Sequence, residues 1–327
     1  MKAFTNANAR DLTRAITLVR QARDAHRSVA LAGGGSDLLG MMKEGLVAPD
    51  VVVHLGSIKS LDRVTVKNGV TIGGSTTLDA LATNAAIRRD YRVLAEAAES
   101  VATPQIRNVA TIAGNVCQRP WCWYYRNGFK CLKNGGTTCY SISGENEFHA
   151  IFGGGPSYIV HPSDTASALV ALDATFRIVG PAGERRVAAA DFFTLPTVDA
   201  SRENVLKNDE VLAEIVVPAR PAGTRSTYHK ILDREAWTHA VVSAAVVLDM
   251  NKDVCRTARI VLGGVAPIPW RLPEVEKLLA GQRITPELAA AAGEAAVAGA
   301  KPLAKNAYKV PLTRNMVRRT LEDIARA

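Results

Sequence analysis

The spacing of apolar residues predicts alternating helices and strands in the first part of the chain. Residues 11–23 show the three-and-four spacing of an amphipathic helix, whereas 28–32 and 51–55 are short apolar runs typical of buried strands. A further strand is expected over 70–73, and two helical patterns lie between it and residue 100. This order indicates two α/β units in succession.

The regular spacing stops in the middle of the chain. Residues 104–115 are expected to be extended and to close on a Gly-Asn turn, and from residue 116 to about residue 158 Cys, Trp, Tyr, Asn and Gly dominate, so this stretch is interpreted as an insertion. Beyond it, Ser163 or Asp164 can cap a helix that runs to Leu172. Strands over 174–179 and 213–217 complete the second unit.

A third unit follows the segment 218–223, which holds two prolines and a glycine and is typical of a linker. Strand patterns come first and helical patterns afterwards, an order that predicts an α+β domain. The strands are expected over 240–248 and 258–265, and the helices over 274–279, 286–298 and 315–325. We therefore divide the chain into 1–57, 58–222 with the insertion at about 116–158, and 223–327.

Composition and charge narrow the function. The formal net charge is +9, but the basic residues are scattered among acidic ones and no recognition motif accompanies them, so nucleic-acid binding is disfavoured. No apolar run approaches the length of a membrane span, and the N-terminus lacks the apolar core of a signal peptide, which favours a cytoplasmic protein. Four of the five cysteines lie between residues 117 and 139, and such clustering indicates a site.

A glycine-rich loop, AGGGSDLLG, lies between the first two predicted strands. It departs from the dinucleotide fingerprint because Leu38 stands where a third glycine is needed, and from the P-loop because Met41 stands where lysine is needed. Backbone N–H groups of this loop and of the second glycine segment, with the hydroxyls of Ser36, Thr111 and Ser163, could bind a pyrophosphate. A plain structural turn remains the alternative for this loop.

Four separated motifs together resemble the FAD-binding medium subunit of the xanthine dehydrogenase and molybdenum hydroxylase family. They are AGGGSDLLGMMK, QIRNVATIAGN, HPSDTASALVALDA and LGGVAPIPWR, and the resemblance covers nearly the whole chain. The family's TIGGN reads TIAGN here, which keeps Gly114 and Asn115. The resemblance implies an α+β fold, with two α/β FAD-binding subdomains of the PCMH type, not Rossmann, and a C-terminal α+β domain.

The resemblance also implies a set of FAD-binding residues. The pyrophosphate and ribityl would be wrapped by the first loop, Leu31, Ala32, Gly33, Gly34, Gly35, Ser36, Asp37 and Leu38, and the second loop would be formed by Ile106, Ala110, Thr111, Gly114 and Asn115. The polar chain of the cofactor would be bound by Ser163 and Asp164. The flavin or adenine would pack on Val211 and Leu212, and the isoalloxazine would lie near Lys230. No catalytic residue is expected. Without the resemblance, Asp164 would be a helix cap and Lys230 a solvated surface lysine.

The clustered cysteines are Cys117, Cys122, Cys131 and Cys139, and their spacing lacks the C-x-x-C pairs of a zinc ribbon. Iron–sulfur clusters are held by Cys thiolates, so this spacing favours a [4Fe–4S] cluster. Two disulfides, or unpaired thiols, are the alternatives. The fifth cysteine, Cys255, is expected to be an ordinary buried thiol.

The insertion is similar to the one in the FAD subunits of 4-hydroxybenzoyl-CoA reductase and of a periplasmic aldehyde oxidase, which carry an extra [4Fe–4S] cluster. Cys122, Cys131 and Cys139 match that pattern in order. The fourth ligand departs from it, because those relatives take it from downstream of the third cysteine, where this chain has none. Cys117 is the only nearby substitute, and a site with three cysteines is the alternative.

The function implied by the resemblance is that of an oxidoreductase subunit that transfers electrons through FAD. Its partners would be a small subunit with two [2Fe–2S] clusters and a molybdopterin-binding large subunit that oxidises an aldehyde, a purine or another heterocycle. A self-contained flavin reductase and a non-redox cysteine-rich metal-binding protein are the alternatives. The compartment would be periplasmic if a signal-bearing partner exported the complex. The sequence identifies neither the substrate of the complex nor its final electron acceptor.

Overall fold

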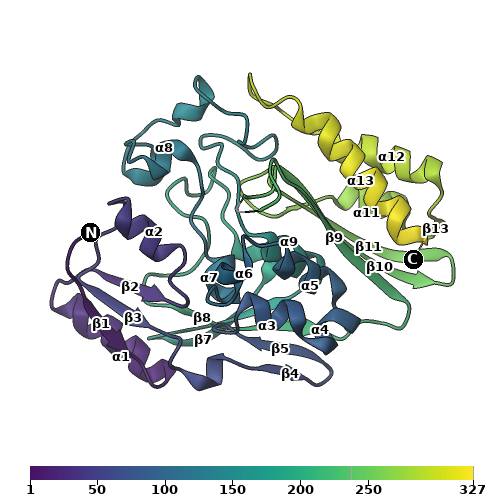
Figure 1. Ribbon diagram of the computed structural model, residues 1–327. Coiled ribbons are helices and arrows are strands. Elements are labelled where there is room, and N and C mark those ends of the chain that lie inside the picture. Colours follow the sequence, from purple (N-terminus) through teal and green to yellow (C-terminus); the bar gives the residue numbers. More distant parts are fainter. Residues whose placement is uncertain (237, 327) are drawn as a thin grey trace.

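The computed structural model describes residues 1–236 and 238–326, and within them three β-sheets organise the chain (Figure 1). The first sheet is parallel, with the strand order β1 (Thr5–Asn8), β3 (Val51–His54), β2 (Val29–Ala32). Helix α1 (Leu12–Asp24) packs on it, and α2 (Leu38–Lys43) follows β2. Asp11 caps α1 by accepting the N–H of Arg14 at 2.7 Å. The first predicted α/β unit is confirmed.

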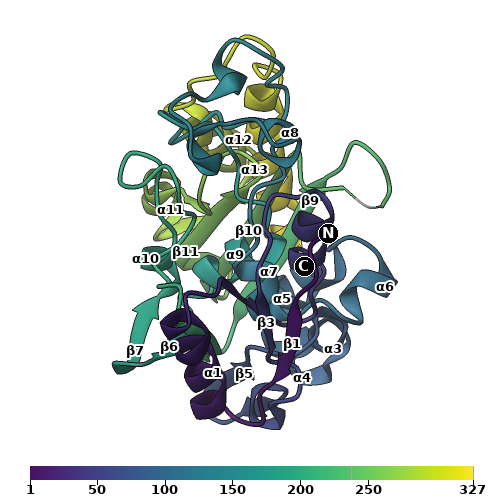
Figure 2. The same cartoon turned by 90° about the vertical axis from the view of Figure 1, so that its left-hand side faces the viewer.

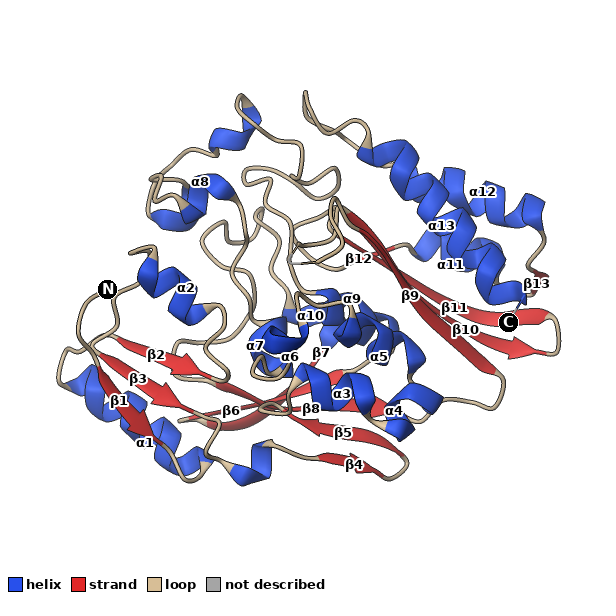
Figure 3. Ribbon diagram, in the orientation of Figure 1, coloured by secondary structure: helices blue, strands red, loops and turns tan. Residues whose placement is uncertain are grey.

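The second sheet is antiparallel throughout (Figure 3). Its order is β4 (Val64–Val66), β5 (Gly69–Gly73), β8 (Val211–Pro218), β6 (Thr175–Gly180), β7 (Gly183–Ala188). The helices packed with it are α3 (Leu78–Thr83), α4 (Ala85–Asp90), α5 (Arg92–Glu99), α9 (Asp164–Ala171) and α10 (Ala189–Phe192). The strands predicted at 70–73, 174–179 and 213–217 are confirmed. The edge strands β4 and β7 escaped prediction because they are short and largely exposed.

The prediction of an extended segment over 104–115 is wrong. The structure has two short helices there, α6 (Pro104–Arg107) and α7 (Ile112–Val116). Thr103 and Thr111 cap them, because their hydroxyls accept the N–H groups of Ile106 and Gly114. Proline at the first helical position favours such a start. The two capping threonines therefore indicated the helix starts, which the spacing of apolar residues did not show.

The insertion is mostly loop, with α8 (Trp123–Arg126) and the 3₁₀ turns η2 (Leu132–Asn134) and η3 (Tyr140–Ile142); a further turn, η1 (Lys59–Leu61), precedes β4. Figures 1 and 2 both show the insertion on the side of the molecule away from the second sheet, above α7. In this position it bridges the N-terminal part of the chain and the C-terminal helices.

The third sheet has the order β12 (Trp270–Arg271), β11 (Val254–Gly263), β10 (Val242–Asn251), β9 (Thr224–Ile231), and β13 (Gln282–Arg283) also pairs with β11. One face packs against α11 (Pro273–Leu279), α12 (Pro286–Val297) and α13 (Lys309–Arg326), and the other against α5 and α9. The α+β class is thus confirmed, with β9 added to the predicted strands. No described helix is long and apolar enough to cross a membrane.

Candidate functional site

A cavity of about 480 Å³ lies where the three parts of the chain meet. The residues around it come from the glycine-rich loop, the α6–α7 segment, the insertion and the segments 160–164, 233–234 and 238–240. Seven of the predicted FAD-binding residues line it: Ser36, Asp37, Ile106, Ala110, Gly114, Asn115 and Asp164. Segments far apart in the sequence therefore supply one shared site.

The glycine-rich loop packs directly on the second glycine segment. A Cβ atom at Gly34 would stand 1.7 Å from the carbonyl oxygen of Val109, and one at Gly33 would stand 2.4 Å from the hydroxyl of Thr111. Only glycine allows this close backbone approach. Gly35 has a φ of +74°, which also favours glycine. These contacts explain why the loop keeps three consecutive glycines despite matching neither phosphate-loop fingerprint.

Asn115 and Ser163 are joined by hydrogen bonds beneath the cavity. Asn115 Oδ1 accepts from the hydroxyls of Ser163 and Thr165, both at 2.6 Å, and Ser163 Oγ also caps α9 by accepting the N–H of Ala166 at 3.1 Å. The predicted capping of α9 is confirmed. Thr165 was missed, since its contact with Asn115 joins residues fifty positions apart. The network fixes α7 against the start of α9.

Asp164 receives two strong hydrogen bonds from β9. Tyr228 donates to Oδ1 at 2.6 Å, and Lys230 Nζ donates to Oδ2 at 2.7 Å and to the carbonyl of Ser100 at 3.0 Å. Burial, and then the charge of Asp164, raise the pKa of Tyr228 well above its usual value, so its hydroxyl stays a donor. Tyr228 escaped the sequence analysis, although it lies two positions from Lys230 on the same face of β9.

The other predicted FAD-binding residues lie outside the cavity lining. Leu31 and Ala32 belong to β2, and Val211 and Leu212 belong to β8, where they are buried. Seven more of the predicted residues lie in or beside the segments that line the cavity: Gly33, Gly34, Gly35, Leu38, Thr111, Ser163 and Lys230. Their contact with a cofactor stays a prediction.

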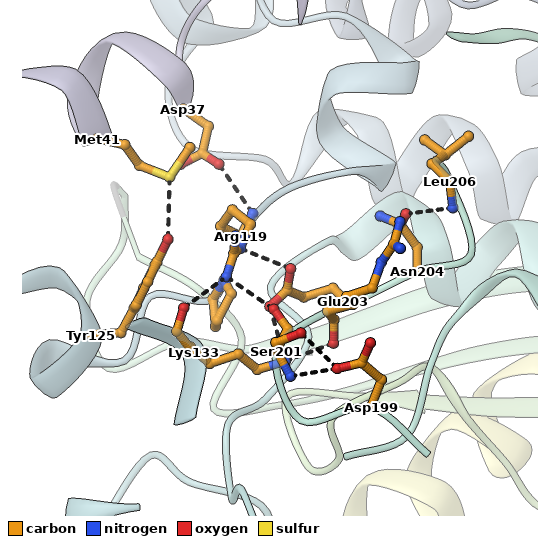
Figure 4. Close-up of polar contacts among 12 residues, drawn as sticks. Asp37, Met41, Arg119, Tyr125, Lys133, Asp199, Ser201, Glu203, Asn204 and Leu206 are labelled. Atoms are coloured by element: carbon orange, nitrogen blue, oxygen red, sulfur yellow. Dashed lines mark hydrogen bonds and ion pairs between the residues drawn. The ribbon is translucent and has the colours of Figure 1, made fainter. Parts of the chain in front are cut away.

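Ion pairs join the insertion to the glycine-rich loop and to the segment that follows β7, and Figure 4 shows those that Glu203 makes. Asp37 on the glycine-rich loop accepts the backbone N–H of Arg119 at 3.1 Å and the guanidinium of Arg126 at 2.7 Å. Glu203, beyond β7, pairs with Arg119 at 2.8 Å and with Lys133 at 3.0 Å. The side chains of Lys133 and Glu203 are 2% and 5% exposed. These ion pairs and hydrogen bonds are directional, and they set the position of the insertion.

Three of the four clustered cysteines lie near one another. Cys122 and Cys131 pack with Met41 and Tyr125, and burial raises the pKa of the Cys122 thiol to about 11, with a further contribution from Cys139 and Cys131. The Sγ of Cys122 also lies 3.4 Å from Nε2 of His149.

Cys117 is separate from these three thiols, which corrects the prediction of a four-cysteine group. It ends α7 and packs against the apolar core of the second sheet, where burial alone raises its pKa to about 12. Helix α7 directs its side chain into that core. Within the part of the chain that the structure describes, no group of three or more His, Cys, Asp or Glu residues could hold a metal ion.

Comparison with known proteins gives matches along nearly the whole chain. Residues 2–220 match the model of the FAD binding domain in molybdopterin dehydrogenase, and residues 227–324 match that of the CO dehydrogenase flavoprotein C-terminal domain. The aldehyde oxidoreductase FAD-binding subunit PaoB of Escherichia coli is 32% identical, over 99% of this chain and 98% of that protein.

Two matches concern carbon monoxide dehydrogenase of Hydrogenophaga pseudoflava. Its medium chain is 29% identical, over 89% of this chain and 87% of that protein. A solved structure of that enzyme, lacking the Mo-pyranopterin moiety of its cofactor, superposes with a TM-score of 0.77 at 27% identity and covers 98% of this chain and 96% of that chain.

Proposed function

Because the chain belongs to the family of FAD-binding medium subunits of the xanthine dehydrogenase and CO dehydrogenase type, and is therefore an oxidoreductase subunit, we propose that it is the electron-transfer subunit of a molybdenum hydroxylase complex. It passes electrons from [2Fe–2S] clusters of a small partner subunit, through FAD, to a final acceptor. A molybdopterin-binding large subunit oxidises the substrate, an aldehyde or a heterocycle. The observation that carries this proposal is the cavity between the three parts of the chain.

The residues around the cavity fit FAD. The glycine-rich loop brings backbone N–H groups close to the second glycine segment, and such groups favour a pyrophosphate. The lining also holds apolar side chains such as Ile106 and Ala110 for a flat ring system. Bound FAD supplies the redox chemistry, while the chain positions it and excludes water. Asp164 and Lys230 form a buried pair at the rim of this site.

The insertion is proposed to carry an iron–sulfur cluster on Cys122, Cys131 and Cys139. The three thiols lie near one another, and bound iron would have to hold them as thiolates against the burial that raises the pKa of Cys122 to about 11. Their side chains form no metal-binding group in the described part of the chain, so the proposal rests on their number and proximity. Cys117 does not fit as the fourth ligand because it packs in a separate core. An imidazole nitrogen, Nε2 of His149, lies beside the Cys122 thiol, so a nitrogen ligand is available there. A metal-free thiol group is the competing outcome.

Anaerobic purification of the chain with its co-purifying subunits tests the electron-transfer proposal. We expect flavin, iron and molybdenum together, and a flavin absorbance that bleaches when a substrate aldehyde reduces the molybdenum subunit. Flavin without molybdenum or iron would instead indicate a self-contained flavin reductase. Zinc without flavin would indicate a non-redox metal-binding protein. Separation of periplasmic from cytoplasmic extract before the purification reports in which compartment the complex resides.

The cluster is tested separately by substitution of single cysteines. Cys131→Ser is expected to lower iron and sulfide content and to change the electron paramagnetic resonance spectrum of the reduced protein. Cys117→Ser and Cys255→Ser, which alter thiols in two other apolar cores, are expected to leave both unchanged. Equal iron content in all three variants would contradict a cluster at this site.

A further inference from the structure

Arg126 lies behind the cavity wall and contacts both the glycine-rich loop and the insertion. Its guanidinium donates to Asp37 Oδ1 at 2.7 Å, to the carbonyl of Pro120 at 3.0 Å and to that of Arg119 at 3.0 Å. The side chain is 6% exposed although it is charged. Such a buried arginine is stable only because carboxylate and carbonyl oxygens surround it.

The same guanidinium lies over the indole ring of the insertion's Trp121. Its central carbon is 4.2 Å from the centre of the indole ring, within the range of a cation–π contact. Trp121 in turn contacts the ring of His239, with 5.3 Å between the ring centres. Trp121, His239 and Asp37 all line the cavity, whereas Arg126 does not. A continuous chain of contacts therefore joins the glycine-rich loop, the insertion and the C-terminal domain.

Trp121 is 42% exposed, so the contacts of its ring with Arg126 and His239 act on a side chain that solvent reaches on one side. Its neighbour Trp123 is similar in exposure, at 40%, and also lines the cavity, but its ring packs on Phe148 and its Nε1 donates to the carbonyl of Glu145, both within the insertion. The two tryptophans thus differ in their connection to the C-terminal domain and not in type or exposure.

We propose that Arg126 is a positioning residue of the FAD site: it joins Asp37 to Trp121, holds Trp121 against His239, and so closes the cavity over the cofactor. The proposal rests on FAD binding in this cavity. A guanidinium suits the role because it can bond a carboxylate at its edge while it stacks on an aromatic ring with its face, which an ammonium group cannot do. Closure of this wall slows the release of FAD.

The test compares Trp121→Ala with Trp123→Ala in the FAD-loaded, full-length protein as purified with its partners. The rate of FAD release after dilution is followed by the rise in free-flavin fluorescence. Trp121→Ala loses both the cation–π and the aromatic contact, so we expect release about tenfold faster. Trp123→Ala is expected to change it less than about twofold, since the contacts of its ring with Phe148 and with the carbonyl of Glu145 both lie within the insertion.

Two conservative variants separate positioning from a general loss of structure. Trp121→Phe keeps an aromatic face and is expected to restore slow release, and Arg126→Lys keeps the charge beside Asp37 but not the stacked plane, so its release rate is expected to be intermediate. Iodide quenching of the bound flavin should increase in the same order as release. Arg126→Met could disturb folding, which is why the exposed tryptophans carry the test.

Each outcome decides between the proposals. Equal release rates in Trp121→Ala and Trp123→Ala, or no rescue by Trp121→Phe, would overturn the positioning role. A wild-type chain that binds no FAD would overturn FAD binding itself, before any variant is compared.

Discussion

The C-terminal domain and the insertion are held in place by different forces. In the C-terminal domain, one face of β9–β11 and the helices α11–α13 bury a continuous apolar core that includes Leu248, Leu262 and Leu279. In the insertion the buried apolar group is small, with Tyr125 and Cys131 packed on Met41 of α2. Its place depends instead on ion pairs such as Lys133 with Glu203.

The insertion also uses polar contacts to reach the C-terminal domain. Asn146 Oδ1 accepts the N–H of Lys305 at 2.9 Å, Asn306 donates to the carbonyl of His149 at 3.0 Å, and Lys309 Nζ donates to that of Phe148 at 2.9 Å. Apolar burial is non-directional and spreads over many residues, whereas these contacts fix one geometry. The core therefore supplies stability, and the polar contacts determine where the insertion stands beside the cavity.

The largest expected effect follows from Glu203→Gln. The change leaves the buried ammonium of Lys133 and the partly exposed guanidinium of Arg119 without their carboxylate, and loss of one partner costs about 3–5 kcal/mol for a buried pair such as Lys133 with Glu203. Limited proteolysis should cut the insertion faster, and urea unfolding should report the lower free energy of unfolding. Glu184→Gln, in an exposed pair with Arg177, is the control and should cost less than about 1 kcal/mol. Equal losses in the two variants would contradict the comparison.

A slightly smaller effect is expected from Leu248→Ala in β10. This fully buried side chain leaves a cavity when it is shortened, and the free energy of unfolding should fall by about 3 kcal/mol. Proteolysis within the insertion should change less than in Glu203→Gln, since the ion pairs remain. The control is Leu278→Ala on α11, which is partly exposed. A loss as large in that variant would show that burial does not decide the cost.

The smallest effect, when it is measured per pH unit, concerns His161. Burial lowers the pKa of His161 from 6.5 to about 3, with the ring against Phe193 and Nδ1 accepting the N–H of Ser163. Between these values the unfolded chain binds a proton that the folded chain does not, so stability falls with decreasing pH by at most about 1.4 kcal/mol per pH unit. His161→Asn should show a flatter slope in urea unfolding between pH 6.5 and 4. Identical slopes would contradict a buried neutral His161.

Sequence analysis succeeded where a local signal was strong. The cap of α9 at Ser163 and the helical spacing of α12 were predicted, and the structure confirms both. It failed for α6 and α7, which are too short for periodicity to show, and for β9, whose polar sequence resembles a linker. Tyr228 and Lys230 on β9 become buried only because Asp164 receives their hydrogen bonds.

By itself, the sequence determined the α+β class, the glycine segments and the family, because periodicity, glycine spacing and motifs are local properties of the chain. The tertiary structure alone decided that Cys117 lies apart from Cys122 and that Arg126 joins Asp37 to Trp121. Those two arrangements depend on the directions in which side chains of different helices and loops point. Spacing along a chain constrains distance, but only packing sets the direction in which a side chain points.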